Sequence, residues 1–150
     1  MVMDIRFKRL SEYAIIPTKA YDDDLGLDLY ASAADTILPN TSKLISTDVA
    51  CQFPVKWRGG EWISYGGIIK DRSSISSKYQ VYVKAGVIDP PYRGEIKVLM
   101  HNFGDKIFHI SRGMKIAQMI LVESTVVEIL EVEELSGSQR NDRGLGSSGI

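Results

Sequence analysis

The acidic side chain best placed to do chemistry is Asp89, because it stands at the end of an apolar run and directly before a bend. The run reads Ala85-Gly86-Val87-Ile88-Asp89, and Pro90-Pro91-Tyr92-Arg93-Gly94 follows it. A strand that ends in such a turn holds its last side chain rigidly. A carboxylate held in this way can orient a water molecule and accept its proton. The alternative is a tight β-turn with structural roles only, but the length of the segment favours a functional site.

A second segment, residues 70–74, carries donors that suit a phosphate group. Arg72 supplies a fork of N–H donors, and the hydroxyls of Ser73 and Ser74 follow it where a short helix is expected to begin. The structural alternative is a surface arginine beside a helix cap. Three residues of this kind are a weak signal taken alone.

Two polar residues interrupt apolar runs elsewhere in the chain. Asp28 lies inside residues 25–31, and Gln118 lies inside residues 112–120. An unpaired charge is costly in apolar surroundings, and a buried amide needs a hydrogen-bond partner. From these residues alone, Asp28 is best interpreted as an aspartate of a turn or strand edge. Gln118 is either a satisfied core side chain or a ligand contact.

The last fifteen residues, 136–150, differ in composition from the rest of the chain. They hold four Gly, four Ser and two Arg, which is too little apolar surface to order a segment alone. We therefore divide the chain into a β domain over residues 1–135 and a flexible Gly/Ser/Arg-rich arm over residues 136–150. Composition favours a frayed terminus, and the functional alternative is an arm whose N–H groups and arginines close over an anion.

The elements that must position these residues are predicted to be short strands. Alternating or β-branched runs recur between Gly, Pro, Asn and Asp, and they lie at residues 28–31, 43–51, 79–83, 95–100, 107–110 and 116–122. Many short strands with frequent turns indicate an all-β sandwich or barrel. One helical turn is expected at residues 73–78 with Ser73 or Ser74 as its cap. Residues 126–135 fit helix and strand about equally, and the β-branched Thr125-Val126-Val127 favours a strand.

Residues 55–67 are predicted to form a hairpin with an aromatic tip. Trp57 and Trp62 flank Gly59-Gly60, which suits a two-residue turn. The favoured interpretation is that the two indoles pair across the hairpin, rather than form a platform for a ligand.

Composition excludes several functions. The net charge of −1 gives no global field for nucleic acid. Cys51 is the only cysteine, so no intrachain disulfide or cysteine metal cluster forms, and His101 and His109 lack helical ligand spacing. No signal-peptide core or membrane-length apolar run is present. We therefore expect no membrane and no nucleic-acid partner, and an intracellular location in the cytoplasm or nucleus, that of a host cell if the protein is viral.

Taken together and in order, the segments around Asp28, Arg72, Asp89 and Gln118 and the arm resemble the five motifs of the trimeric dUTPases. The resemblance covers residues 26–149, and its third, fourth and fifth motifs are the specific ones. It implies a distorted jelly-roll β-barrel with one short helix, and a homotrimer whose C-terminal arms close over active sites at subunit interfaces. It also implies Mg²⁺-assisted hydrolysis of the partner molecule dUTP to dUMP and pyrophosphate, which limits uracil in DNA and supplies dUMP.

The resemblance also implies a role for each candidate residue. Asp89 matches the acid that activates water, Tyr92 the aromatic beneath the deoxyribose, and Asp28 the aspartate near the water shell of the metal. Arg72 is the second catalytic residue. The other residues that match substrate-binding positions are Ser73, Ser74, Lys84, Ala85, Gly86, Gln118, Arg140, Arg143, Leu145, Gly146, Ser147 and Ser148.

Some positions depart from the family pattern. Leu145 stands where an aromatic residue usually stacks on uracil, at a cost of ~1 kcal/mol of stacking. Either Arg140 or Arg143 could reach phosphate. Two other functions stay open. A dUTPase-like regulatory protein would bind a partner through the Trp hairpin, and a dCTP deaminase is disfavoured because Leu99 stands where deaminases carry a catalytic Glu.

Overall fold

The computed structural model describes residues 3–139 and 142, and within them the chain folds into twelve strands and one short helix. The strands are β1 Arg6–Arg9, β2 Gly26–Tyr30, β3 Asp35–Ile37, β4 Ser42–Ile45, β5 Val49–Gln52, β6 Val55–Arg58, β7 Glu61–Lys70, β8 Val81–Val83, β9 Val87–Ile88, β10 Val98–Asn102, β11 Phe108–Ile110 and β12 Lys115–Ser124. This confirms the predicted all-β class.

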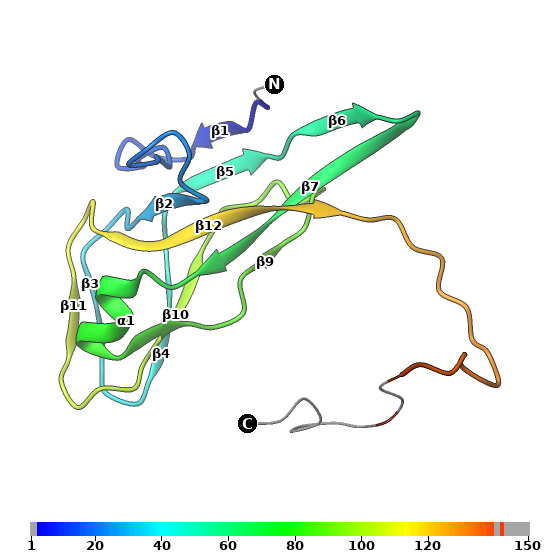
Figure 1. Cartoon of the computed structure of the whole chain (residues 1–150). Helices are drawn as coiled ribbons and strands as arrows, with labels where there is room; N and C mark the ends of the chain where they lie inside the picture. The colour runs from blue at the N-terminus through cyan, green and yellow to red at the C-terminus, as the bar shows by residue number, and fades with distance from the viewer. Residues whose placement is uncertain (1–2, 140–141, 143–150) are drawn as a thin grey trace.

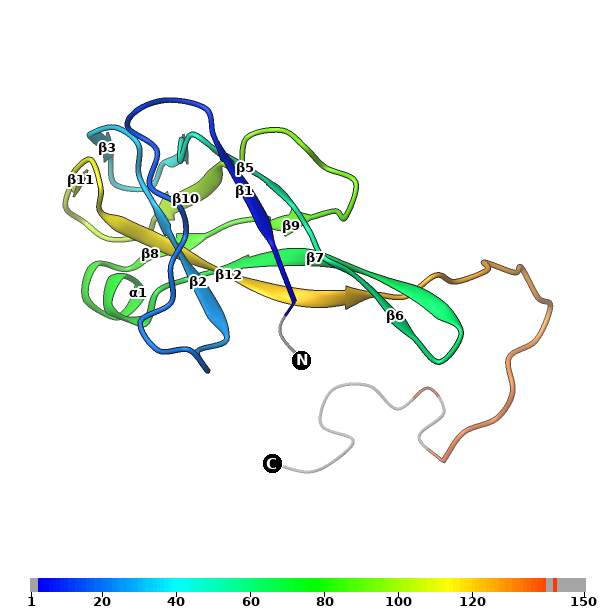
Figure 2. The same cartoon turned by 90° about the horizontal axis from the view of Figure 1, so that it is seen from above.

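The longest strands, β7 and β12, pair antiparallel and form the centre of the largest sheet. Its order is β2-β12-β7-β6, with β9 also paired to β7. The smaller groups β1-β5, β4-β10-β8 and β11-β3 lie around it (Figures 1 and 2). All of these pairings are antiparallel. The arrangement agrees with the expected jelly-roll-like barrel.

The core forms because strands from every sheet turn alternate side chains inward. Met100 on β10 and Met119 on β12 are almost completely buried, as is Ile37 on β3. The buried Asn102 donates through Nδ2 to the carbonyls of Ile37 and Lys106, at 2.9 and 2.7 Å. Its polar group is thus satisfied inside the core, as burial requires.

The helix α1 spans Ser73–Tyr79, close to its predicted position, but neither serine caps it. The residue before the helix, Arg72, has an extended backbone and makes no side-chain cap bond. Its carbonyl accepts from the N–H groups of Ile75 and Ser76, both at 3.0 Å. Ser73 therefore already lies inside the first turn, and the cap prediction is wrong. No helix in the described part of the chain is long and apolar enough to cross a membrane.

The hairpin of β6 and β7 confirms the predicted Trp pair. Trp57 lies opposite Trp62 in the register, and their ring centroids are 5.2 Å apart in an edge-on arrangement. Gly59 and Gly60 form the turn, with φ of 62° and 94°. The hairpin extends beyond the other strands beside the end of β12 (Figure 1). Both indoles stay more than half exposed.

The segment after β12 is the clearest departure from prediction. Residues 126–135 were expected to form a strand, but they run away from the barrel without regular structure (Figures 1 and 2). Val126, Ile129 and Leu135 are 95%, 91% and 89% exposed. The β-branched Thr125-Val126-Val127 favoured a strand, yet no strand of the described part of the chain lies beside this segment. A strand needs a paired neighbour as well as β propensity.

Candidate functional site

The register of the main sheet brings three sequence-predicted residues together. Gln118 in β12 pairs with Asp28 in β2 on one side and with Lys70, the last residue of β7, on the other. Arg72 follows two residues after Lys70 and starts the turn into α1. Residues from three separate motifs therefore meet at one end of this sheet, although they are far apart in the sequence.

These residues line a cleft of about 380 Å³, which we call the Arg72 cleft. Its walls are Ala20, Asp24, Leu25, Gly26, Asp28, Arg72, Ser73, Ser74, Lys115 and Gln118. Guanidinium, ammonium, hydroxyl and amide groups converge there. Such a set of donors suits a phosphate chain.

Asp28 is the buried centre of the Arg72 cleft rather than a strand-edge residue. The residue is 7% exposed. One carboxylate oxygen pairs with the Arg72 guanidinium, and the other forms an ion pair with Lys115 Nζ at 2.7 Å. Two cations therefore satisfy the buried charge that the sequence left without a partner.

Sequence reasoning missed Lys115. A β-bulge between Lys115 and Ala117 shifts the pairing of β12 with β2, and Ile116 and Ala117 are both buried. Strict alternation from Gln118 would turn Lys115 to the opposite face. The extra residue turns it to the cleft instead, as bulges beside functional sites often do. A local sequence pattern carries no signal for a bulge.

Gln118 has the partner that its position required. Its Nε2 donates to the carbonyl of Asp71 at 2.8 Å. Gly26 makes room for the amide, because a Cβ on Gly26 would lie 2.1 Å from Gln118 Oε1. The glutamine is therefore hydrogen-bonded, and it also lines the Arg72 cleft.

Asp89 lies at the end of β9 as predicted, with its side chain exposed. The N–H of Tyr92 donates to the Asp89 carbonyl at 3.0 Å and closes the turn. Tyr92 Oη donates to the carbonyl of Glu95 at 3.0 Å. Gly94 leaves space for that ring, since a Cβ there would lie 2.4 Å from Tyr92 Oη. The turn therefore fixes both the acid and the aromatic.

Asp89 and Tyr92 line a second cleft of about 420 Å³, which we call the Asp89 cleft. Its walls are Leu44, Val87, Ile88, Asp89, Tyr92, Glu95 and Lys97. The Asp89 cleft and the Arg72 cleft share no lining residue. Within one chain, the described site residues thus fall into two groups, one with phosphate-type donors and one with the candidate base.

The backbone of residues 84–86 is packed tightly against the main sheet. Ala85 and Gly86 have φ of 58° and 107°. The Ile69 N–H donates to the Gly86 carbonyl at 2.8 Å, and a Cβ on Gly86 would lie 2.9 Å from the Ile69 carbonyl oxygen. Gly86 matches a substrate-binding position of the family, and the close approach that the structure contains is to β7. The Asp71 carboxylate accepts from the Val83 N–H and ties this segment to the turn before Arg72.

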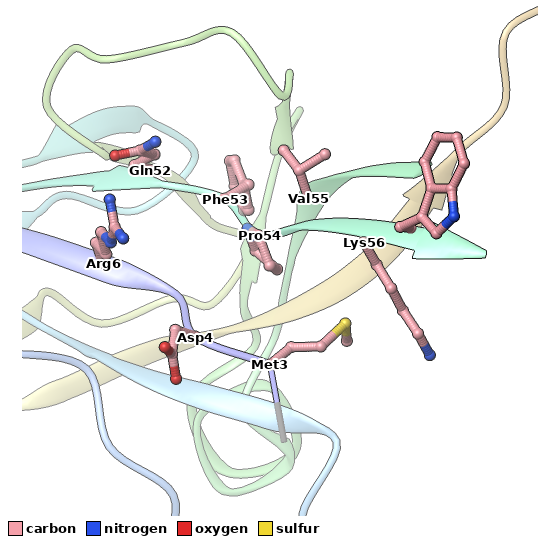
Figure 3. Close-up of a pocket in the computed structure, with 9 residues that line it drawn as sticks. Met3, Asp4, Arg6, Gln52, Phe53, Pro54, Val55 and Lys56 are labelled. Carbon is pink, nitrogen blue, oxygen red and sulfur yellow. The ribbon is translucent and has the colours of Figure 1, made fainter. Parts of the chain in front are cut away.

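The arm residues Arg140, Arg143, Leu145, Gly146, Ser147 and Ser148 lie outside the described residues. A further cavity of about 550 Å³ lies between the N-terminal segment, including Arg6, and the residues from Gln52 to Trp57. Figure 3 shows Met3, Phe53 and Pro54 among its walls. None of the predicted site residues that the structure describes lines this cavity.

Two other chemistries find no support among the described residues. Burial raises the pKa of the Cys51 thiol to about 11, against a smaller opposing effect of Arg93. This thiol is therefore neutral at physiological pH and a poor nucleophile. No three His, Cys, Asp or Glu side chains within residues 3–139 and 142 gather as a metal-binding group.

The structure is thus an all-β fold of the jelly-roll type, with donors that suit phosphate in one cleft and a carboxylate on a turn in the other. The dUTPase family model matches residues 12–149. The chain therefore belongs to the dUTPase family.

Individual relatives agree with this assignment. The deoxyuridine 5'-triphosphate nucleotidohydrolase of Trichodesmium erythraeum is 40% identical over 98% of this chain and 99% of that protein. The human mitochondrial enzyme of the same name is 36% identical over 98% of this chain and 55% of that protein. The Staphylococcus bacteriophage 80alpha dUTPase with dUpNHpp has a TM-score of 0.86 and 27% identity, with 98% of this chain and 99% of that chain covered.

These findings establish the activity of the chain as a dUTP diphosphatase. It hydrolyses dUTP to dUMP and pyrophosphate. The sequence-based assignment of family, fold class and reaction is confirmed.

Proposed function

We propose that Asp89 is the general base of this reaction. It would hold a water molecule in line with the α-phosphorus and accept its proton as the bond to pyrophosphate breaks. The single observation that carries the proposal is the position of Asp89. It is an exposed carboxylate on a closed turn, with Tyr92 fixed beside it in the same cleft.

The other side chains divide into two tasks. The Asp89 cleft would hold the nucleoside, with Tyr92 beneath the deoxyribose and the backbone of Lys84, Ala85 and Gly86 against uracil. The Arg72 cleft would hold the phosphates through Arg72, with Ser73, Ser74 and Gln118 as further donors. Charge on the transferring group would be stabilised there, which is usually the largest contribution to catalysis.

Mg²⁺ fits this arrangement as an ion that arrives with the triphosphate. When bound, it would neutralise the negative charge of the triphosphate and of the pyrophosphate that leaves. An ionised carboxylate has about four acceptor positions, and the two ion pairs of Asp28 occupy one position on each oxygen. Asp28 can therefore still accept from a metal-bound water. Sites that hold Mg²⁺ by few carboxylates and substrate phosphates are common.

We further propose that the complete site forms between copies of the chain in a homotrimer. The support is the separation of the Asp89 cleft from the Arg72 cleft, which share no wall among the described residues of one chain. Pairing the Asp89 cleft of one copy with the Arg72 cleft of another would bring base and phosphate donors together. A closed cyclic assembly repeats such a contact once per copy.

The segment over residues 126–135 also supports an assembly. Val126, Ile129 and Leu135 are large apolar residues with almost complete exposure. Soluble proteins rarely leave such a stretch uncovered, so a neighbouring copy is its natural partner. The residues beyond it, including Arg140, Arg143, Leu145 and Gly146 to Ser148, would then reach a site on that neighbour. The division into a domain over 1–135 and an arm over 136–150 belongs to this proposal, as does an intracellular location in the cytoplasm or nucleus.

The proposal for Asp89 is tested by Asp89→Asn, with Asp105→Asn as the matched control at another exposed aspartate. Pyrophosphate release from dUTP should fall by roughly 100-fold or more in the first variant, the scale expected for loss of a general base. The control should keep its rate. Wild-type turnover in Asp89→Asn would exclude this residue as the base. Parallel assays with dCTP, dTTP and UTP, with and without Mg²⁺, define the substrate and the metal requirement.

A second function has one observation in its favour. Trp57 and Trp62 remain exposed at the tip of a projecting hairpin, and exposed Trp residues are frequent in protein interfaces. Such a surface would let the enzyme also engage a regulatory partner protein. The test compares the wild type with a Trp57→Ser, Trp62→Ser double variant. This role is established if the double variant no longer binds a protein that the wild type binds, while dUTP hydrolysis persists. The deaminase alternative has no support, because the residue at its catalytic position is Leu99.

A further inference from the structure

Lys115 is a cationic residue of the Arg72 cleft to which the family resemblance assigned no role. Its Nζ lies 2.7 Å from Asp28 Oδ2 and 5.8 Å from the centroid of the Tyr30 ring. Its side chain is 38% exposed. The ammonium is thus anchored on one side and open on the other.

The backbone of β12 is adapted to place this ammonium. The bulge between Lys115 and Ala117 interrupts the alternation of the strand, so that Lys115 and Gln118 line the same cleft. A bulge disrupts the hydrogen-bonding ladder locally. In β12 the disruption lies at the position where the bulge brings the Lys115 ammonium next to Asp28.

The charges in the cleft explain why that cation matters. Among the described residues, two cations, Arg72 and Lys115, face two carboxylates, Asp24 and Asp28. Asp24 is itself held in place, because its Oδ2 accepts from the Tyr21 N–H at 3.0 Å. The cleft is therefore neutral with Lys115, and it would carry a net charge of −1 without it. A cleft of negative charge would repel a polyphosphate.

We propose that Lys115 is a phosphate-recognition residue, held by Asp28, that balances the two carboxylates and presents a second cation to the phosphate chain of the nucleotide. This inference rests on the proposed function of the Arg72 cleft. It assigns to Asp28 the additional task of orienting Arg72 and Lys115 together. The contribution of Lys115 to binding affinity should grow with the number of phosphates on the nucleotide, because the interaction is between charges.

The direct test compares Lys115→Met and Lys115→Arg with Lys43→Met. Lys43 is a matched control, since it is also a half-exposed lysine in an ion pair, with Asp35 on a different sheet. The affinity for a non-hydrolysable dUTP analogue and for dUMP is measured by calorimetry, and kcat/KM for dUTP is measured alongside. A melting curve verifies the fold of each variant.

We expect Lys115→Met to weaken binding of the triphosphate analogue by about 10- to 100-fold, the range for loss of a hydrogen bond to a charged group. Binding of dUMP should change by no more than about threefold, as for an ordinary surface substitution. Lys115→Arg should restore most of the lost affinity, and Lys43→Met should bind like the wild type. Equal losses for dUMP and the analogue, or no rescue by arginine, would overturn the proposal.

Asp24→Asn provides an independent test if Lys115→Met does not fold. Removal of this carboxylate should tighten binding of the triphosphate analogue, because it raises the net charge of the cleft. Unchanged or weaker binding would refute the charge balance. A wild-type protein that does not bind the analogue contradicts the function of the cleft, whereas an active wild type with an unaffected Lys115→Met variant contradicts only the role of Lys115.

Discussion

Gly86 is the position where the geometry of the site makes the sharpest stability prediction. Its φ is 107°, and a Cβ there would lie 2.9 Å from the backbone oxygen of Ile69 and 3.1 Å from the Cβ of Ile69. The same oxygen belongs to β7, the central strand of the main sheet. A methyl group on Gly86 therefore meets atoms that cannot rotate away.

Gly60 is a matched control for the substitution Gly86→Ala. It has a similar φ of 94° in the Trp hairpin, but nothing lies within 4 Å of the place that a methyl group would occupy there. Gly60→Ala should thus incur only the backbone cost of a positive φ, about 1–2 kcal/mol. Gly86→Ala should add the cost of overpacking, about 1–3 kcal/mol, for a total loss of roughly 2–5 kcal/mol in the free energy of unfolding.

Urea denaturation followed by circular dichroism measures both variants, at one protein concentration because assembly affects apparent stability. Gly86→Ala should also impair dUTP hydrolysis. The shift it forces acts on β9, which pairs with Gly67 and Ile68 and ends directly before Asp89. Gly60→Ala should retain hydrolysis. Equal losses of stability in the two variants would refute the argument that close packing against Ile69 is what requires glycine here.

Three other predictions concern the core and the Arg72 cleft. Cys51 should react with a thiol reagent only as the chain unfolds, because burial raises its pKa to about 11 and keeps the thiol protonated at neutral pH. Rapid labelling of the folded protein would contradict this prediction. Ile116→Ala should lower the free energy of unfolding by about 2–5 kcal/mol in urea, because the side chain is fully buried, and a loss below that range would mean that the site collapses around the cavity. Gly26→Ala should lower both stability and hydrolysis by displacing the Gln118 amide. A double-mutant cycle with Gln118→Ala should show coupling, and strictly additive effects would mean that the two side chains do not interfere.

The sequence predicted best where a local pattern determines the structure. The apolar run before Asp89 and the Pro-Pro bend after it were sufficient to place the acid at the end of a strand. The Trp57–Trp62 pair followed from two indoles flanking Gly59-Gly60. The polar interruption at Gln118 correctly indicated a partner, which is the carbonyl of Asp71.

Prediction failed where non-local geometry decides. Lys115 was missed because a bulge, and not a regular period, turns it toward Asp28. The serine cap was wrong because Arg72, with its extended backbone, stands at the cap position. Thr125-Val126-Val127 favoured a strand over residues 126–135, but the described part of the chain provides no strand for them to pair with. Pairing partners, unlike propensities, cannot be read from a single segment.

The central claim is that Asp89 from one copy and Arg72 from another form one site, and subunit mixing tests it most directly. Asp89→Asn and Arg72→Ala should each be inactive alone. If they are unfolded together in equal amounts and refolded, about a quarter of the sites should combine an intact Asp89 cleft with an intact Arg72 cleft in a random cyclic assembly. We predict recovery of dUTP hydrolysis to about a quarter of the wild-type rate. Mixed assemblies that stay as inactive as the two parents would contradict the claim, because they would show that each site takes both residues from the same chain.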